Sequence, residues 1–139
     1  MLTASGAIVI TLAGPPVAKG RPRFTRKGIA FTPAKTRSFE NLLRFEASQI
    51  MQGKTPLESA LTLTLEAFLP IPSSWSKKQQ LRALGGLVHP TKRPDCDNLL
   101  KTIDSLNGIV WRDDKQIIHA SVTKAYSDRP RIVLTVREV

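Results

Sequence analysis

Cysteine is nearly absent from this sequence, since Cys96 is the only one among 139 residues. One thiol excludes a disulfide within the chain and a zinc site made from several thiolates of the same chain. This composition is typical of a reducing compartment, so we expect a cytoplasmic protein. Long apolar runs are also missing, because no stretch approaches the roughly 20 residues that cross a bilayer. We therefore expect no membrane association.

Acidic residues are scarce and unevenly placed. The chain has 21 Lys and Arg against 11 Asp and Glu, a formal net charge of +10, and no acidic residue precedes Glu40. Such a chain attracts polyanions, nucleic acid above all. Five of its six aspartates nevertheless lie between Asp95 and Asp114. Crowded carboxylates repel one another unless a cation lies among them, and Mg²⁺ prefers oxygen ligands. The pattern therefore indicates metal-assisted phosphodiester chemistry on nucleic acid.

The length is that of one ordinary domain, and we expect a single domain over residues 1–139. Runs that are β-branched or alternate apolar and polar residues predict four strands, at residues 7–13, 57–69, 116–126 and 131–136. Apolar residues at helical spacing predict three helices, at residues 36–51, 75–84 and from about 97 to 106. The alternation of strands and helices indicates an α/β protein.

Several residues are typical of helix ends. Thr36 is expected to cap the first helix, whose apolar stripe would contain Phe39, Leu42, Leu43 and Ile50, with Phe45 as a further candidate. Ser73 or Ser74 is expected to cap the second helix, and Asp95 or Asp97 the third, which Asn107 and Gly108 would end.

The aspartates also suggest a metal site. Asp95 and Asp97 are separated by one residue, so both carboxylates can point to one side of an extended or capping segment. Asp113 and Asp114 follow the helix, and a compact fold could return one of them to its start. Three carboxylates together with water and phosphate oxygens suffice to hold Mg²⁺. The alternative is that these aspartates are ordinary capping and turn residues, and Asp104 could simply pair with Lys101.

The segment from Lys19 to Arg37 carries seven positive residues and no acidic one. Its glycines and prolines predict a loop or an irregular hairpin. The interleaved Phe24 and Phe31 favour contact with nucleic acid over a merely solvated loop. The residues expected to bind DNA are Lys19, Arg21, Arg23, Arg26 and Lys27.

The run RPDCDNLLKTIDSLNGIVWRDDKQI, residues 93–117, resembles the RusA family of Holliday-junction resolvases, whose members carry D-x-D-N-L-x-K followed by D-D-x-Q. The basic opening GPPVAKGRPRFTRKGIAFTPAKTRSFE also resembles that of bacterial and prophage members. This resemblance implies a compact α/β domain with a mixed sheet, a homodimer and paired nicks across four-way DNA junctions. It implies that Asp95, Asp97 and Asp114 hold Mg²⁺, for which Mn²⁺ could substitute, and that Lys101 is catalytic, with Asp113 supporting the metal ligands.

One spacing departs from the family pattern. The family usually places its next aspartate four residues after the lysine, whereas Lys101 and Asp104 are three apart. The helix between them must therefore absorb a rotation of about 100°. Two alternative functions stay open: a non-catalytic nucleic-acid-binding module, and a nuclease that prefers flaps or forks to four-way junctions.

Overall fold

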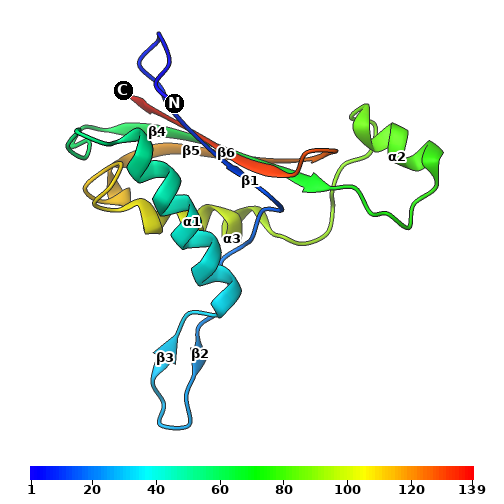
Figure 1. Cartoon of the computed structure of the whole chain (residues 1–139), viewed down its shortest axis with the longest axis horizontal. Helices are drawn as coiled ribbons and strands as arrows, with labels where there is room; N and C mark the ends of the chain where they lie inside the picture. Colours follow the sequence, from blue (N-terminus) through cyan, green and yellow to red (C-terminus); the bar gives the residue numbers. More distant parts are fainter.

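The computed structural model describes all 139 residues as one α/β domain around a mixed four-stranded sheet (Figure 1). The strands lie in the order β1-β6-β4-β5, with β6 antiparallel to both β1 and β4, and β4 parallel to β5. A second, two-stranded sheet pairs β2 with β3. The strands are β1 (Ile8–Ala13), β2 (Arg23–Phe24), β3 (Ala30–Phe31), β4 (Leu61–Pro70), β5 (Ile117–Ser127) and β6 (Arg131–Glu138). The helices are α1 (Ala34–Ile50), α2 (Lys77–Leu84), α3 (Cys96–Leu100) and the 3₁₀ helices η1 (Lys101–Leu106) and η2 (Asp114–Gln116).

The strands follow the alternation in the sequence, which buries one face of the sheet. In β4 the leucines at 61, 63 and 65 are buried while Thr64 between them is exposed. The predicted strand at residues 57–69 begins too early, because Leu57 instead forms an isolated bridge with Trp111. The other three predicted strands lie within two residues of β1, β5 and β6.

Helix α1 crosses the buried face of the sheet (Figure 1). It buries Phe39, Leu43 and Ala47 at intervals of one turn, whereas Leu42 and Phe45, expected in the apolar stripe, are exposed. The predicted Thr36 cap is wrong, since the helix begins at Ala34 after Pro33.

Helix α2 belongs to an excursion between β4 and α3 that extends away from the sheet (Figure 1). Its cap is Ser76, whose hydroxyl accepts a hydrogen bond from the Gln79 amide at 3.2 Å, so the expected caps Ser73 and Ser74 are wrong. The ring of Trp75 packs edge-on against that of Tyr126 on β5, with centroids 5.3 Å apart. This contact fixes the base of the excursion on the sheet.

The segment expected as one helix from about 97 to 106 is two helices of different geometry. The α-helical turns of α3 end at Leu100, and η1 continues with 3₁₀ geometry. A 3₁₀ helix rotates about 120° per residue against about 100° in an α-helix. Over the three steps from Lys101 to Asp104 in η1 this adds about 60°. The change of helix type therefore supplies a little more than half of the rotation that the short spacing from Lys101 to Asp104 requires.

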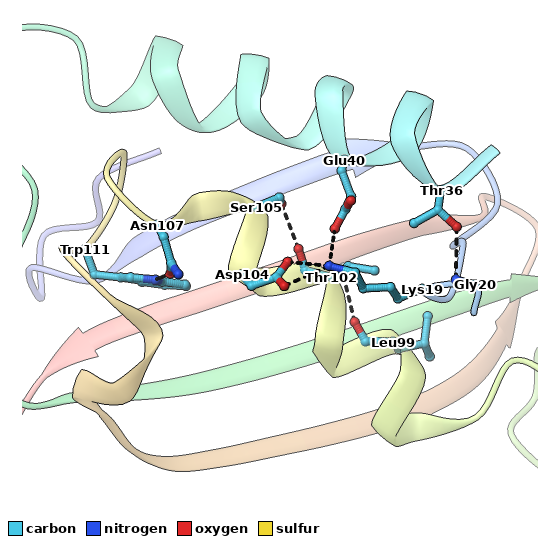
Figure 2. Close-up of polar contacts among 10 residues, drawn as sticks. All are labelled: Lys19, Gly20, Thr36, Glu40, Leu99, Thr102, Asp104, Ser105, Asn107 and Trp111. Atoms are coloured by element: carbon cyan, nitrogen blue, oxygen red, sulfur yellow. Dashed lines mark hydrogen bonds and ion pairs between the residues drawn. The ribbon is translucent and has the colours of Figure 1, made fainter. Parts of the chain in front are cut away.

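Trp111 locks the return of the chain after η1. It is fully buried in the core, and its indole N–H donates to the Asn107 side-chain oxygen at 2.7 Å (Figure 2). The bridge from Trp111 to Leu57 holds the chain beside the segment that leads into β4, directly before Asp113 and Asp114. No helix in the protein is long and apolar enough to cross a membrane.

Candidate metal centre and nucleic-acid interface

Asp95 and Asp97 lie at the start of α3 without acting as side-chain caps. Asp95 is the N-cap residue, with extended backbone angles (φ −77°, ψ 146°), and Asp97 lies in the first turn. The Asp95 side chain caps no backbone N–H, and the backbone carbonyl of Asp95 accepts from Leu99 at 3.0 Å. Both residues are exposed. Their carboxylates are therefore free to take an external ligand.

Asp113 and Asp114 differ sharply in what their carboxylates do. Asp113 caps η2: its carboxylate accepts from the Lys115 amide at 2.9 Å, and its own amide donates to the Gln116 side-chain oxygen at 2.9 Å. Gln116 also donates to the carbonyls of Leu57 and Ser59, at 2.9 and 3.0 Å. This capping box fixes the turn that carries the neighbouring Asp114, whose side chain is partly buried.

The pKa values of these two carboxyl groups are shifted in opposite directions. The hydrogen bond from the Lys115 amide lowers the pKa of Asp113. Partial burial raises the pKa of Asp114, and the negative charges of Asp113 and Asp104 raise it further. Asp114 thus lies close to two other carboxylates, and a bound divalent cation would relieve the repulsion among them.

Asp97, Lys101 and Asp114 line one hollow of ≈ 410 Å³, together with Leu100, Ile103, Ile117 and Ala120. The fold therefore brings Asp114 close to α3, the return that the sequence analysis gives as possible. Asp95 is not among the lining residues, and no three His, Cys, Asp or Glu side chains lie close enough together to hold a metal ion. The hollow thus presents two carboxylates. Because Mg²⁺ keeps several waters and commonly takes one or two protein carboxylates, this donor set fits it.

Lys101 contributes the positive charge of the hollow. Its ammonium lies 3.4 Å from the side-chain oxygen of Asn98, at the long end of a hydrogen bond, and makes no ion pair with Asp104. The expected pairing of Lys101 with Asp104 is therefore wrong, and the Lys101 ammonium remains available to a ligand in the hollow.

Asp104 pairs instead with Lys19, a contact that the sequence did not predict (Figure 2). The Lys19 ammonium donates to both Asp104 carboxylate oxygens, at 2.9 and 2.7 Å, and lies 3.4 Å from Glu40 on α1. The Lys19 amide also donates to the Asn98 carbonyl at 2.9 Å, and the Gly20 amide to the Thr36 hydroxyl at 3.0 Å. Lys19 is thus engaged within the protein, unlike the other residues expected to bind DNA.

The remaining basic residues of the segment form an exposed arm. Arg23 and Phe24 of β2 pair with Phe31 and Ala30 of β3, and the hairpin extends away from the domain below α1 (Figure 1). Every residue from 21 to 31 is exposed. The expected irregular hairpin is confirmed, and four of its expected DNA-binding side chains are accessible: Arg21, Arg23, Arg26 and Lys27.

A larger cavity of ≈ 620 Å³ lies elsewhere, between the N-terminal segment, the end of α1 and β6. Its lining includes Leu2, Ile8, Met51 and Val136 but none of the clustered aspartates. The larger cavity is also lined by Lys54 and Glu138, but the Glu138 carboxylate already accepts a hydrogen bond from the Ser59 hydroxyl. The smaller hollow is the better candidate for chemistry, because two of the clustered aspartates meet a lysine there.

Comparison with known proteins identifies the family. The family model of the endodeoxyribonuclease RusA matches residues 13–137. The chain belongs to the RusA endodeoxyribonuclease family. It is also similar to the "Uncharacterized protein YqaN" of Bacillus subtilis (strain 168), with 37% identity over 138 residues that cover 95% of this chain and 96% of that protein. RusA membership supports a nuclease that acts on DNA and implies activity on Holliday junctions.

Proposed function

We propose that this protein is a Mg²⁺-dependent endonuclease that resolves four-way DNA junctions by paired nicks. The observation that carries the proposal is the meeting of Asp97, Lys101 and Asp114 on one hollow, in a member of the RusA family. Helix capping does not account for the two aspartates, because Asp113 caps η2 and the α3 cap position has no side-chain cap bond. Mn²⁺ is expected to substitute for Mg²⁺, since both accept carboxylate and water ligands.

Asp97 and Asp114, which line the hollow, would hold the metal. Asp95, the N-cap residue of the same helix, lies outside that lining and would join the ligand set only if the chain before α3 shifts toward the hollow. When bound, the metal supplies a nucleophilic hydroxide and offsets charge on the scissile phosphate. Lys101 already lines the hollow. It would therefore contact a phosphate oxygen there without any change in the backbone. Asp113 would support Asp114 through the capped turn that both share.

Two symmetric cuts require two sites, so we propose that the active form is a homodimer. The exposed hairpin of each subunit would grip phosphates of one arm through Arg21, Arg23, Arg26 and Lys27. The single, exposed Cys96 fits a reducing compartment, and we place the reaction in the cytoplasm.

The test is a cleavage assay on four DNAs of shared sequence: a four-way junction, a flap, a duplex and a single strand, each with and without Mg²⁺. Paired nicks confined to the junction, and only with the metal, are the expected result. Faster cleavage of flaps would move the substrate to forked DNA. Binding without cleavage in either Mg²⁺ or Mn²⁺ would reduce the protein to a nucleic-acid-binding module.

A further inference from the structure

The hairpin formed by β2 and β3 exposes aromatic side chains that a simple phosphate grip does not need. Phe24 is 68% exposed and Phe31 42% exposed, and Ile29 between them is 62% exposed. Phe24 pairs with Ala30, and Phe31 with Arg23. Because successive side chains of a strand point to opposite faces, Phe24 lies on one face of the ribbon and Phe31 on the other.

The turn holds these side chains in a defined position. The Thr25 amide donates to the Ile29 carbonyl at 2.9 Å, and the Ile29 amide donates to the Thr25 hydroxyl at 3.1 Å. Gly28 takes a left-handed conformation (φ +79°), which a residue with a side chain rarely adopts, and its amide closes the turn onto the Thr25 carbonyl at 2.9 Å. The ribbon is therefore preorganised, so little entropy is lost when it presents Phe24 to a ligand.

The base of the hairpin is hydrogen-bonded to α3 and η1. The Lys19 amide bonds the Asn98 carbonyl, one residue after Asp97, and the Lys19 ammonium bonds Asp104 on η1. A nucleic acid held by the hairpin is thus held at a set position relative to the hollow.

The charge around the phenylalanines specifies the partner. Arg21, Arg23, Arg26 and Lys27 lie on the same exposed segment, and no acidic residue lies before Glu40. Phosphates of an intact duplex would satisfy these cations but offer nothing to an aromatic face, since paired bases stack on one another. Bases at a branch point, where stacking is interrupted, do offer a free face. A protein partner rich in carboxylates is a poorer match for two phenylalanines on opposite faces of a two-residue ribbon.

We propose that the hairpin reads the branch point: Phe24 stacks on a base left unstacked where DNA strands exchange, while Arg26 and Lys27 at the tip hold the adjoining phosphates. This inference rests on the proposed action on branched DNA and deepens it, by assigning discrimination between branched and linear DNA to one side chain. Phe31 contacts the base on the opposite face of the ribbon.

The test compares the affinities of the whole protein for a four-way junction and for a duplex of the same length, in EDTA so that no cleavage occurs. Phe24→Ala is expected to weaken junction binding by about tenfold while duplex binding stays unchanged. Phe24→Trp should retain the preference, because indole also stacks. Phe45→Ala, which removes a phenylalanine 59% exposed on α1, is the matched control and should change neither affinity.

A 2-aminopurine base at the branch point gives a second readout. Its fluorescence should change on adding the wild-type protein or Phe24→Trp, and not on adding Phe24→Ala. An unchanged ratio of junction to duplex affinity in Phe24→Ala, or an equal loss on both DNAs, would overturn the stacking role while leaving the cleavage activity standing. Absence of any junction preference in the wild type would overturn both this role and the proposed substrate.

Discussion

Lys19 and Asp104, 85 positions apart in the sequence, form a bidentate ion pair with nitrogen to oxygen distances of 2.9 and 2.7 Å (Figure 2). The pair joins the base of the β2–β3 hairpin to η1, the 3₁₀ helix that follows α3. Burial alone would lower the pKa of Lys19, but the bond to Asp104 and the charge of Glu40 outweigh it and raise the pKa. The pair is therefore expected to stabilise the fold around neutral pH and to lose this effect above about pH 10, as the pH rises through the raised pKa of Lys19.

Lys19→Met should lower the stability and the cleavage rate while leaving the salt dependence of DNA binding unchanged. The variant removes the counter-ion of Asp104, and with partial exposure of both groups we expect a loss of about 1 kcal/mol in the free energy of unfolding. A shift of η1 relative to the hairpin should appear in kcat more than in KM.

The matched control is Arg21→Met, which removes an exposed cation two residues away and should flatten the slope of log K against log salt by about 0.9. A similar flattening in Lys19→Met would show that Lys19 contacts phosphate in the complex. Restored stability and kcat in the charge swap of Lys19→Asp with Asp104→Lys would identify the pair as the cause.

Glu40→Gln should raise the stability near neutral pH. Burial raises the pKa of Glu40, the charge of Asp104 raises it further, and Lys19 only partly opposes this. One buried carboxylate oxygen of Glu40 has no hydrogen-bond partner, because Lys19 gives its short bonds to Asp104. Replacing the carboxylate by a neutral amide removes the cost of keeping a charge there.

The stability gained by Glu40→Gln should depend on pH in one direction. A raised folded-state pKa means that the folded protein holds the proton more tightly, so wild-type stability falls as pH rises from the ordinary glutamate value of about 4.3 through the raised pKa. The melting temperature of Glu40→Gln should therefore exceed that of the wild type at pH 7, and the difference should shrink below pH 4. Glu58→Gln, at an exposed pair with Arg112, should show no such trend. A Glu40→Gln variant that is less stable at pH 7 would mean that the ion pair with Lys19 outweighs burial.

The sequence predicts the four-stranded sheet and α3 well, because both depend on local periodicity, but it does not predict that the helix continues with 3₁₀ geometry as η1. The alternating leucines of β4 and the buried Leu99 of α3 lie where their spacing places them. The helix caps at Thr36, Ser73 and Ser74 were wrong, since several neighbouring residues can cap equally well and tertiary contacts decide: the Thr36 hydroxyl bonds Gly20 instead.

The candidate site was predictable only in part. The D-x-D and D-D pairs mark carboxylates, and the meeting of Asp97 with Asp114 follows from the chain returning after Trp111. No local signal links Lys19 to Asp104 or Glu40, because nothing in their spacing records a contact made through folding. The same holds for Asp95, which the sequence groups with Asp97 but which the structure places outside the lining of the hollow.

Neutralising the arginines of the β2–β3 hairpin should weaken DNA binding without unfolding the protein. The variant has Arg21, Arg23 and Arg26 changed to Gln. Each phosphate contact that it loses should reduce the slope of log K against log salt concentration by about 0.9 for binding to the duplex arms of the DNA. All three residues are exposed, so the melting temperature should stay at the wild-type value. Neutralising the exposed Lys54 and Arg129 provides the control. An unchanged slope in the triple variant would make the hairpin an ordinary solvated loop.

Asp97→Ala tests the metal centre without relying on cleavage. Mg²⁺ that binds only the folded protein should raise the wild-type melting temperature, by an amount that shrinks as falling pH protonates the ligands. Asp97→Ala should lose most of that shift, and Asp114→Ala likewise, because each removes one of the two carboxylates that line the hollow. Without metal, Asp114→Ala should be at least as stable as the wild type, since it removes a carboxylate whose pKa is raised by partial burial and by the charges of Asp113 and Asp104. Asp128→Ala, at an exposed aspartate between β5 and β6, should keep the full Mg²⁺ shift. If Asp97→Ala also keeps it and is merely less stable in both conditions, Asp97 supports the helix start and does not hold the metal.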